Sequence, residues 1–207
     1  MASRAPALGG YGVRMDHGGT VLIDRERIRA RVHQMGQALS DDLASALERE
    51  GHDALSHPDR IVMMPIMTGA MVFTADLIRE MPLKLSIRLV TVSSYPGQST
   101  ESKGASLRGA LPKDLGGRHV VLIDDILDTG RTLKLVRDLV VEQGPASVRS
   151  CVLLNKPERR EADITAEHVG FDIPDEFVVG YGLDFDGFYR NVPDIVSLSE
   201  KAQGTGH

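Results

Sequence analysis

The amino-acid sequence predicts an α/β protein, with a mainly parallel, twisted sheet flanked by helices. Short apolar runs of strand length alternate along the chain with longer segments in which apolar residues recur at helical spacing. This alternation is typical of parallel strands joined by right-handed helical crossovers. The chain has 207 residues, of which 42% are hydrophobic, and this is enough to bury one α/β core. We therefore expect a single domain with short appendages.

The N-terminal part of the chain predicts an arm followed by a long helix. Residues 1–20 are rich in Gly and have no apolar period, so we expect a loose arm there. Asp24 is a candidate N-cap, and helical spacing follows it until a helix end near Gly51. The apolar positions of this helix are Ile28, Val32, Met35, Leu39, Leu43 and Leu47. The polar run at 40–42 leaves two readings open, one continuous helix or two helices.

The remaining elements alternate between strand and helix. Buried strands are predicted at 61–66, 85–94, 120–123 and 148–154, and helices at 70–80 and 133–143. Thr68 is the candidate cap of the first of these two helices. Ligands of such sheets bind beyond the carboxyl ends of the strands. The residues that fall at those ends are Thr68, Gly69, Tyr95, Asp125 and Lys156.

Composition and charge exclude several classes of function. The net charge is −5 and no basic run is longer than Arg159-Arg160, so an extended nucleic-acid surface is not expected. No apolar stretch approaches a membrane span, and the N-terminus lacks the apolar core of a signal peptide. The single cysteine, Cys151, lies in an apolar run and is expected to be a small core residue, not a nucleophile. We expect a cytoplasmic protein that binds neither membrane nor nucleic acid.

The segment 120–132, VVLIDDILDTGRT, carries the most specific chemistry in the chain. Its four apolar residues predict a buried parallel strand, and Asp124 and Asp125 follow directly. The next residues contain one Gly and two hydroxyls and lead into a helical pattern. A loop of this kind presents backbone N–H groups and a helix N-terminus to an anion, which makes it a candidate phosphate cradle.

The two halves of this segment suit two parts of one ligand. The N–H groups and the helix dipole suit a phosphate, whereas the adjacent carboxylates suit sugar hydroxyls or a divalent cation. A sugar phosphate satisfies both. The alternative is an ordinary strand end followed by a turn. It is the weaker reading, because three carboxylates within five residues are followed here by Thr-Gly-x-Thr.

This segment resembles the phosphoribosyl pyrophosphate (PRPP) signature of the type I phosphoribosyltransferases. Four further segments narrow the resemblance to the hypoxanthine-guanine phosphoribosyltransferases: MTGA at 67–70, SSYPGQST at 93–100, LLNKP at 153–157 and GFDIPDEFVVGYGLDFDGFYR at 170–190. The resemblance runs from about Val21 to Ser199 and implies the type I phosphoribosyltransferase fold, with a small hood subdomain formed by the termini. The expected organisation is an arm at 1–20, one domain at 21–200 and a tail at 201–207.

The resemblance assigns roles to the residues of the signature. Asp128 matches the catalytic residue that accepts or hydrogen-bonds the N7 proton of the purine, and it stands at the entrance of the PRPP phosphate loop. Asp124 and Asp125 match an acidic pair oriented towards the ribose hydroxyls. The residues that match the 5′-phosphate cradle are Thr129, Gly130, Arg131 and Thr132. Relatives commonly have Lys where this chain has Arg131, which keeps the charge but not the hydrogen-bond geometry.

Two further sets of residues match the pyrophosphate and purine sites of the family. The pyrophosphate set is Met67, Thr68, Gly69 and Arg190, and the family often has a cis peptide at the position between Met67 and Thr68. The purine set is Lys156, Phe177, Val178 and Asp184. In the family the lysine donates to the exocyclic oxygen at C6, the aromatic ring stacks on the base, and two backbone carbonyls face its C2 edge. An ammonium donor favours a keto oxygen over the amino group of adenine.

The resemblance also implies a metal and a lid. Asp184 matches a carboxylate that binds the Mg²⁺ associated with pyrophosphate, with Asp124 and Asp125 as further candidate ligands. Ser94 and Tyr95 match the start of a loop that closes over the active site, and a long polar segment at 95–109 follows them. Loops of this length inside a compact domain are often lids, although composition alone favours a plain surface loop.

The sequence therefore predicts a magnesium-dependent purine-salvage transferase that makes IMP or GMP and pyrophosphate from PRPP and a 6-oxopurine. Two alternatives remain: a xanthine-preferring phosphoribosyltransferase, and a phosphoribosyltransferase-like RNA-binding regulator, which the charge distribution disfavours. The expected partners are the small-molecule substrates and further copies of the chain, as a homo-oligomer that is a dimer or a tetramer.

Overall fold

The computed structural model describes residues 19–53, 59–93 and 106–198. Its main element is a seven-stranded sheet in the order β5-β4-β2-β6-β7-β8, with β3 paired to β2. The strands are β2 (Ile61–Met67), β3 (Ser86–Ile87), β4 (Val90–Ser93), β5 (Ser106–Leu107), β6 (His119–Leu127), β7 (Ser147–Asn155) and β8 (His168–Asp172). Only β5 runs antiparallel to its neighbour, so the predicted parallel sheet is confirmed.

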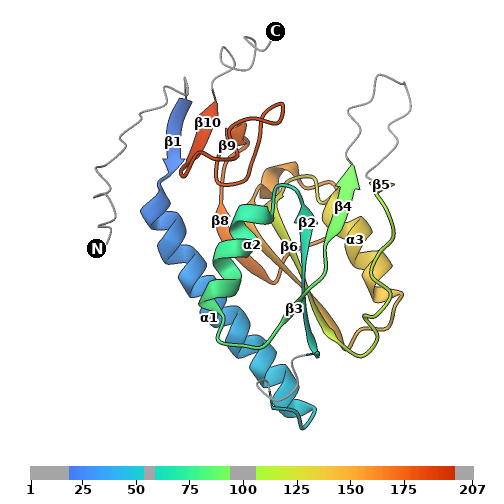
Figure 1. The fold of residues 1–207 in the computed structure, drawn as a ribbon. Coiled ribbons are helices and arrows are strands. Elements are labelled where there is room, and N and C mark those ends of the chain that lie inside the picture. The colour runs from blue at the N-terminus through green and yellow to red at the C-terminus, as the bar shows by residue number, and fades with distance from the viewer. Residues whose placement is uncertain (1–18, 54–58, 94–105, 199–207) are drawn as a thin grey trace, which may run out of the picture.

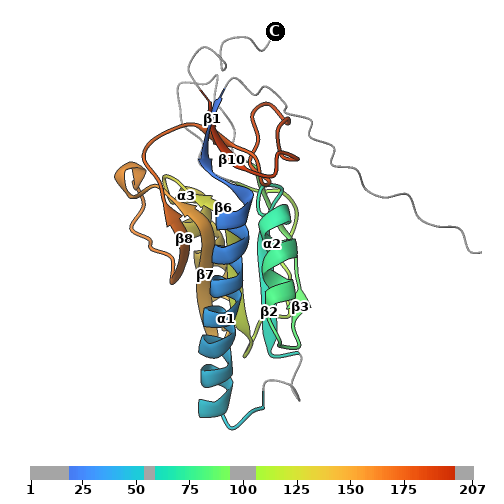
Figure 2. The same cartoon turned by 90° about the vertical axis from the view of Figure 1, so that its left-hand side faces the viewer.

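Helices cover both faces of this sheet. Helices α1 (Arg25–Arg49) and α2 (Met71–Leu77) lie on one face and α3 (Arg131–Val141) on the other (Figures 1 and 2). Alternate residues of the central strands point to opposite faces of the sheet. Val121 and Ile123 pack with α1 and α2, whereas Val120 and Leu122 pack with α3. Because both faces are buried, the central strands carry continuous apolar runs, which is the pattern that the sequence shows.

Helix α1 is one continuous helix, so the reading of two helices divided at 40–42 is wrong. Its N-cap is Asp24, whose side chain accepts a hydrogen bond from the Arg27 backbone N–H at 2.9 Å, as predicted. The hydroxyl of Ser40 donates to the carbonyl of Gly36 at 2.7 Å. Asp42 pairs with Arg149 on β7, with Oδ2 2.6 Å from Nε. The polar run therefore has partners inside and beside the helix and does not interrupt it.

Two other predicted elements differ in detail. The strand expected at 85–94 is divided into β3 and β4. The helix expected at 70–80 is α-helical only in α2 and continues as a 3-10 turn, η1 (Ile78–Glu80). Its cap is Ala70 and not Thr68, because the helix begins three residues after Thr68 and no side chain caps it. Thr68 is thereby left in the loop that follows β2.

A second, smaller sheet is built from both ends of the described chain. It contains β1 (Gly19–Ile23), β10 (Ile195–Leu198) and β9 (Val178–Val179) in the order β1-β10-β9, all antiparallel. In Figure 1 it lies beyond the carboxyl ends of β2 and β6, as expected of a hood formed by the termini. Because β1 begins at Gly19, residues 19 and 20 belong to this sheet and not to the predicted arm.

Burial supports the expectation for the single cysteine. The Cys151 side chain on β7 is fully buried, and burial raises the pKa of its thiol to about 12. Such a thiol stays protonated near neutral pH and behaves as a core residue. Within the described ranges, no helix combines the length and apolar character that crossing a membrane requires.

Candidate active site

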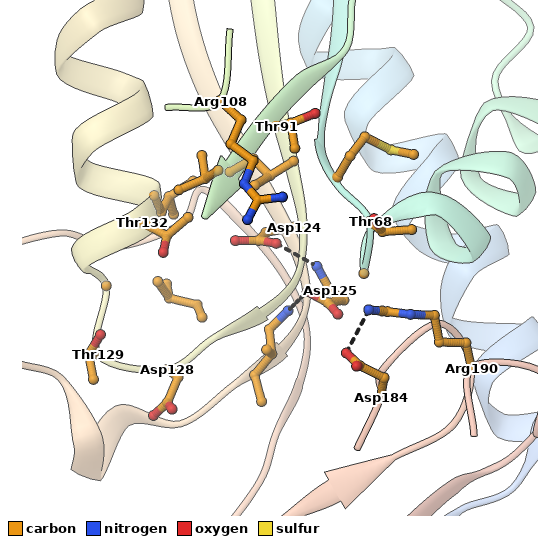
Figure 3. Close-up of a pocket in the computed structure, with 18 residues that line it drawn as sticks. Thr68, Thr91, Arg108, Asp124, Asp125, Asp128, Thr129, Thr132, Asp184 and Arg190 are labelled. Carbon is orange, nitrogen blue, oxygen red and sulfur yellow. Dashed lines mark hydrogen bonds and ion pairs between the residues drawn. The ribbon is translucent and has the colours of Figure 1, made fainter. Parts of the chain in front are cut away.

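A cavity of about 560 Å³ opens where the carboxyl ends of β2, β4 and β6 meet. Its walls come from the loop after β2, the end of β6, the loop that leads into α3, and the segment that carries Asp184 and Arg190 (Figure 3). Strand β6 pairs with β2 on one side and β7 on the other, so its carboxyl end lies at the centre of the sheet edge. This is the position at which open parallel sheets bind ligands.

The acidic pair projects into this cavity from the last part of β6. The strand extends to Leu127, so Asp124 and Asp125 lie within it and not beyond it. Asp124 is 8% exposed, and its Oδ1 accepts a hydrogen bond from the backbone N–H of Asp125 at 3.1 Å. Burial raises the pKa of both carboxyls, and the neighbouring Asp125 charge raises that of Asp124 further. Both side chains line the cavity, where their oxygens can accept hydrogen bonds from hydroxyls.

The loop after β2 packs directly against Asp125. A Cβ built on Gly69 would lie 1.9 Å from Oδ2 of Asp125, a distance that no side chain tolerates. The peptide bond between Met67 and Thr68 is cis, as the resemblance implied. Met67, Thr68 and Gly69 all line the cavity. Glycine at position 69 therefore allows the loop after β2 to approach the Asp125 side chain of β6 closely.

The loop between β6 and α3 has the geometry of an anion cradle. Gly130 has φ of +84°, and a Cβ there would lie 2.8 Å from Cγ2 of Ile164. Thr129, Gly130 and Thr132 line the cavity at the N-terminus of α3, where a helix leaves N–H groups without partners inside the helix. The N–H of Arg131 donates to Oγ1 of Thr129 at 3.5 Å. The side chain of Arg131 takes no part in the cavity wall, because its Nη2 lies 2.6 Å from Oε2 of Glu161 in an exposed ion pair.

Asp128 is held by an arginine that sequence analysis did not assign. Oδ1 of Asp128 accepts a hydrogen bond from Nε of Arg159 at 2.8 Å. Arg159 ends η2 (Pro157–Arg159), and the carboxylates of Asp128 and Asp175 raise the pKa of its guanidinium. The next residue, Arg160, donates to the backbone carbonyls of Leu127 and Asp128. In the sequence, the adjacent Arg159 and Arg160 were the only indication of the contact with Asp128.

The residues predicted to bind the purine lie beside the cavity and, apart from Asp184, do not line it. Lys156 is 7% exposed, its backbone N–H donates to Leu127 at 3.0 Å, and its Nζ lies 3.6 Å from Oδ1 of Asp175. Phe177 is exposed just before β9 and meets Phe185 edge to face, with centroids 5.5 Å apart. Val178 is buried in β9. Lys156 is thus joined to the cavity wall through the end of β6.

Asp184 and Arg190 form an ion pair beside Asp125, on the side of the cavity away from Thr129 and Thr132 (Figure 3). Nη2 of Arg190 lies 2.7 Å from Oδ1 of Asp184, and Nη1 donates to the carbonyl of Gly182 at 2.6 Å. The other oxygen of Asp184 accepts a hydrogen bond from the Gly187 N–H at 2.8 Å. The structure therefore brings together the signature segment, the loop after β2 and the Asp184–Arg190 pair.

Comparison with known proteins agrees with this geometry. The family described as "Phosphoribosyl transferase domain" matches residues 34–186. The hypoxanthine-guanine phosphoribosyltransferase of Mycobacterium avium is 39% identical over 88% of this chain and 86% of its own length. The chain belongs to the hypoxanthine-guanine phosphoribosyltransferase family.

Solved structures of this family share the fold. A hypoxanthine phosphoribosyltransferase of Staphylococcus aureus superimposes with a TM-score of 0.80 at 36% identity, covering 93% of this chain and 98% of that one. A point mutant of the Trypanosoma cruzi hypoxanthine phosphoribosyltransferase, complexed with the product IMP, has a TM-score of 0.77 at 31% identity, with 90% and 93% covered.

Two polar residues of the phosphoribosyltransferase cavity were not predicted from the sequence. Thr91 on β4 and Arg108 after β5 both line it. Arg108 stands at the far end of the long polar segment that begins near Tyr95, and no local pattern distinguishes it from a surface arginine. Its proximity to Asp124 arises from the pairing of β5 with β4. The predicted lid residues, Ser94 and Tyr95, lie outside the described residues.

Proposed function

We propose that the protein transfers the ribose 5-phosphate of PRPP to hypoxanthine or guanine, producing IMP or GMP and pyrophosphate. The observation that carries this proposal is the meeting of the acidic pair of β6, the loop before α3 and the Asp184–Arg190 ion pair around one cavity. Each suits one part of PRPP, namely the ribose hydroxyls, the 5′-phosphate and the pyrophosphate. The Trypanosoma cruzi relative that is complexed with the product IMP supports the same ligand here.

The nucleotide half of the substrate would be held by the signature segment. We assign the ribose hydroxyls to Asp124 and Asp125, because carboxylates accept the hydrogen bonds that hydroxyls donate. The 5′-phosphate would lie against Thr129, Gly130 and Thr132, with the Arg131 contribution made through its backbone N–H and not its paired side chain.

The purine would lie between Asp128 and the Lys156 side. Asp128 would take up or hydrogen-bond the N7 proton, which makes the imidazole ring a better nucleophile towards C1 of the ribose. Oδ1 of Asp128 is bound to Arg159, and among the described residues Oδ2 accepts no hydrogen bond, so Oδ2 is the oxygen assigned to N7. Lys156 would donate to the C6 oxygen, Phe177 would stack on the ring, and carbonyls of Val178 and Asp184 would face its C2 edge.

The leaving pyrophosphate would lie between the loop after β2 and Arg190. Departure of pyrophosphate develops positive charge on the ribose and negative charge on the leaving oxygens. The Arg190 guanidinium and the N–H groups of the Met67–Thr68–Gly69 loop would stabilise the leaving group. Water must be excluded during this step, since it competes with the purine for the ribosyl centre.

The donor set fits a magnesium ion that is shared with the substrate. Each oxygen of Asp184 has one hydrogen-bond partner, and an ionised carboxylate offers about four lone-pair sites, so lone pairs remain for a cation. Within the described ranges, no cluster of three or more His, Cys, Asp or Glu could enclose a metal by itself. This agrees with Mg²⁺, which usually keeps several waters and binds one or two carboxylates together with substrate phosphates. When bound, it would neutralise charge on the pyrophosphate. Asp124 and Asp125 remain the further candidate ligands.

The deciding experiment is a spectrophotometric assay of purified protein with PRPP and Mg²⁺ against hypoxanthine, guanine, xanthine and adenine. Turnover with hypoxanthine and guanine, and little with adenine, is expected. A higher kcat/KM for xanthine would favour the xanthine-preferring alternative, and no turnover with any base would refute the proposal. Assembly as a homo-oligomer stays a prediction, which sedimentation equilibrium of the same preparation would test.

A further inference from the structure

We propose that Arg108 supplies the cationic side chain that binds the 5′-phosphate of PRPP and of the nucleotide product. This inference rests on the proposed function and adds to it the one charged contact that the phosphate loop lacks. The signature segment places an arginine in that loop, but the Arg131 guanidinium is engaged by Glu161 outside the cavity.

The backbone at Arg108 is positioned by strand pairing. Strand β5 pairs antiparallel with β4, in the register Val92 to Leu107. The N–H of Arg108 then donates to the carbonyl of Thr91 at 2.8 Å. Thr91 itself lines the cavity, so this hydrogen bond holds Arg108 at the cavity wall. Figure 3 shows its guanidinium directed into the cavity beside the Asp124 carboxylate.

The charges around the cavity give Arg108 a specific task. Four carboxylates line it, those of Asp124, Asp125, Asp128 and Asp184, whereas the arginines that line it are Arg108 and Arg190. Arg190 is bound by Asp184 and by the Gly182 carbonyl. Among the described residues, the Arg108 guanidinium has no hydrogen bond or ion pair. A phosphate that enters this acidic cavity needs a cation, and Arg108 can turn to it without giving up another partner.

The position of Arg108 favours the 5′-phosphate over the pyrophosphate. In Figure 3 the Arg108 guanidinium lies beside Asp124, between Thr91 and the loop of Thr129 and Thr132. Arg190 lies beside Asp125, on the side away from that loop. An arginine fork adds side-chain donors to the backbone N–H groups of that loop, in a geometry that matches phosphate oxygens. The cavity therefore has one cation for each phosphoryl end of PRPP.

The test compares IMP with inosine, which lacks only the 5′-phosphate, and uses magnesium pyrophosphate as a ligand of the other phosphate site. Calorimetric affinities of IMP, inosine and magnesium pyrophosphate are measured for the wild-type protein, Arg108→Gln and Arg108→Lys. For Arg108→Gln, the affinity for IMP should fall about 10- to 100-fold, the range of a charge-assisted hydrogen bond. The affinities for inosine and pyrophosphate should stay unchanged. The KM for PRPP should rise, whereas the KM for hypoxanthine should stay constant. Arg108→Lys should fall between, because it keeps the charge but not the fork.

Lys113→Gln provides the matched control. Lys113 is an exposed cation five residues further along the same connection, and it does not line the cavity. It should keep wild-type affinity for IMP. Wild-type affinity of Arg108→Gln for IMP would overturn the inference and leave the proposed function intact. A loss of affinity for pyrophosphate alone would have the same consequence. A wild-type protein that neither binds IMP nor turns over PRPP would overturn both.

Discussion

The carboxylates in this cavity differ in burial and in their partners, and these differences separate their roles. Asp124 is buried beside Asp125, and this environment raises the pKa of both groups. Asp128 is half-buried and tied to Arg159, and Asp184 is tied to Arg190. The first two are thus suited to hydroxyls, the third to an N–H proton and the fourth to a cation shared with phosphate.

Replacing Asp128 with Asn should slow turnover while nucleotide binding is retained. The amide nearly keeps the shape of the carboxylate but cannot take up a proton, and a positioned base typically contributes about 10²–10⁴-fold. Single-turnover rates with PRPP and hypoxanthine, together with the affinity for IMP, measure the two effects. A wild-type rate under conditions where chemistry limits turnover would remove Asp128 from the role of base.

Replacing Lys156 with Gln should weaken the preference for 6-oxopurines. The amide of Gln can either donate or accept, whereas the ammonium of Lys156 can only donate. The values of kcat/KM for hypoxanthine and guanine should fall more than that for adenine, by about tenfold or more in their ratio. Equal losses for all three bases would show that Lys156 supports the fold, where it is buried beside Asp175, and not base recognition.

Replacing Asp184 with Asn should raise the magnesium concentration needed for half-maximal rate. The substitution removes the negative charge that a hard cation prefers while keeping most of the shape, including an oxygen for the Gly187 N–H. A titration of Mg²⁺ at fixed PRPP measures the shift. Asp186→Asn, which changes an exposed carboxylate two residues away, is the matched control and should titrate as the wild type does.

At the level of elements, the site depends on how closely the loop after β2 approaches the end of β6. Gly69 allows this approach because it has no side chain, and Gly182 allows a second one, since a Cβ there would lie 2.4 Å from the Gly69 carbonyl oxygen. Three segments far apart in the sequence therefore meet at one backbone position. The glycines at these contacts are as much part of the cavity as the charged side chains.

Replacing Gly69 with Ala should lower both stability and activity. The added Cβ would overlap Asp125 Oδ2, so the Asp125 side chain or the loop must shift, at a cost of about 1–3 kcal/mol in the free energy of unfolding. Urea unfolding and kcat/KM for PRPP measure the two losses. Gly116→Ala is the matched control, because its Cβ would have no neighbour closer than 3.5 Å. Similar behaviour of the two variants would contradict the proposed close packing.

At the scale of the whole molecule, a charge cluster closes the end of the sheet opposite to the cavity. His119, at the start of β6, is buried, and its Nδ1 lies 2.8 Å from the Ser147 hydroxyl. Its Nε2 lies 3.3 Å from Glu50, which also pairs with Arg60. The cluster joins the end of α1 to the starts of β6 and β7. Burial lowers the pKa of His119 below its ordinary value of 6.5, despite the nearby Glu50 charge.

The contribution of His119 to stability should therefore fall as the pH is lowered from about 7.5 to about 5.5, the range in which histidine usually titrates. Asp124 and Asp125, whose pKa values are raised, act in the opposite direction, so the His119 effect is the difference between the wild type and His119→Asn. The unfolded chain accepts a proton on His119 that the folded state resists, so it binds more protons in this range and becomes favoured. Urea unfolding at several pH values measures the slope, and His119→Asn should show a smaller slope. An equal slope in wild type and variant would assign the effect to other groups. Asp42 and Glu167, whose pKa values are lowered, contribute only in more acidic solution.

Features that depend only on neighbouring residues in the chain could be predicted from the sequence alone. Examples are the helical spacing from Ile28 to Leu47, the apolar run before Asp124 and the turn at Gly130. Each can be recognised in a short stretch of sequence, because periodicity, charge and glycine position act locally. The fold class and the central strand followed from them, whereas the family was indicated by the resemblance of segment 120–132 and four further segments to known transferases.

Which of the candidate residues meet depends on contacts that form in the folded protein. The tertiary structure made one helix of α1 by giving Asp42 a partner on β7, and it assembled the small sheet from both ends of the described chain. It also turned Arg131 outwards to Glu161 and brought Arg108 to the cavity through the pairing of β5 with β4. Each of these outcomes depends on a contact between residues far apart in sequence or on competition between two partners for one charge. Their energies do not exist until the chain has folded, so no local pattern records them.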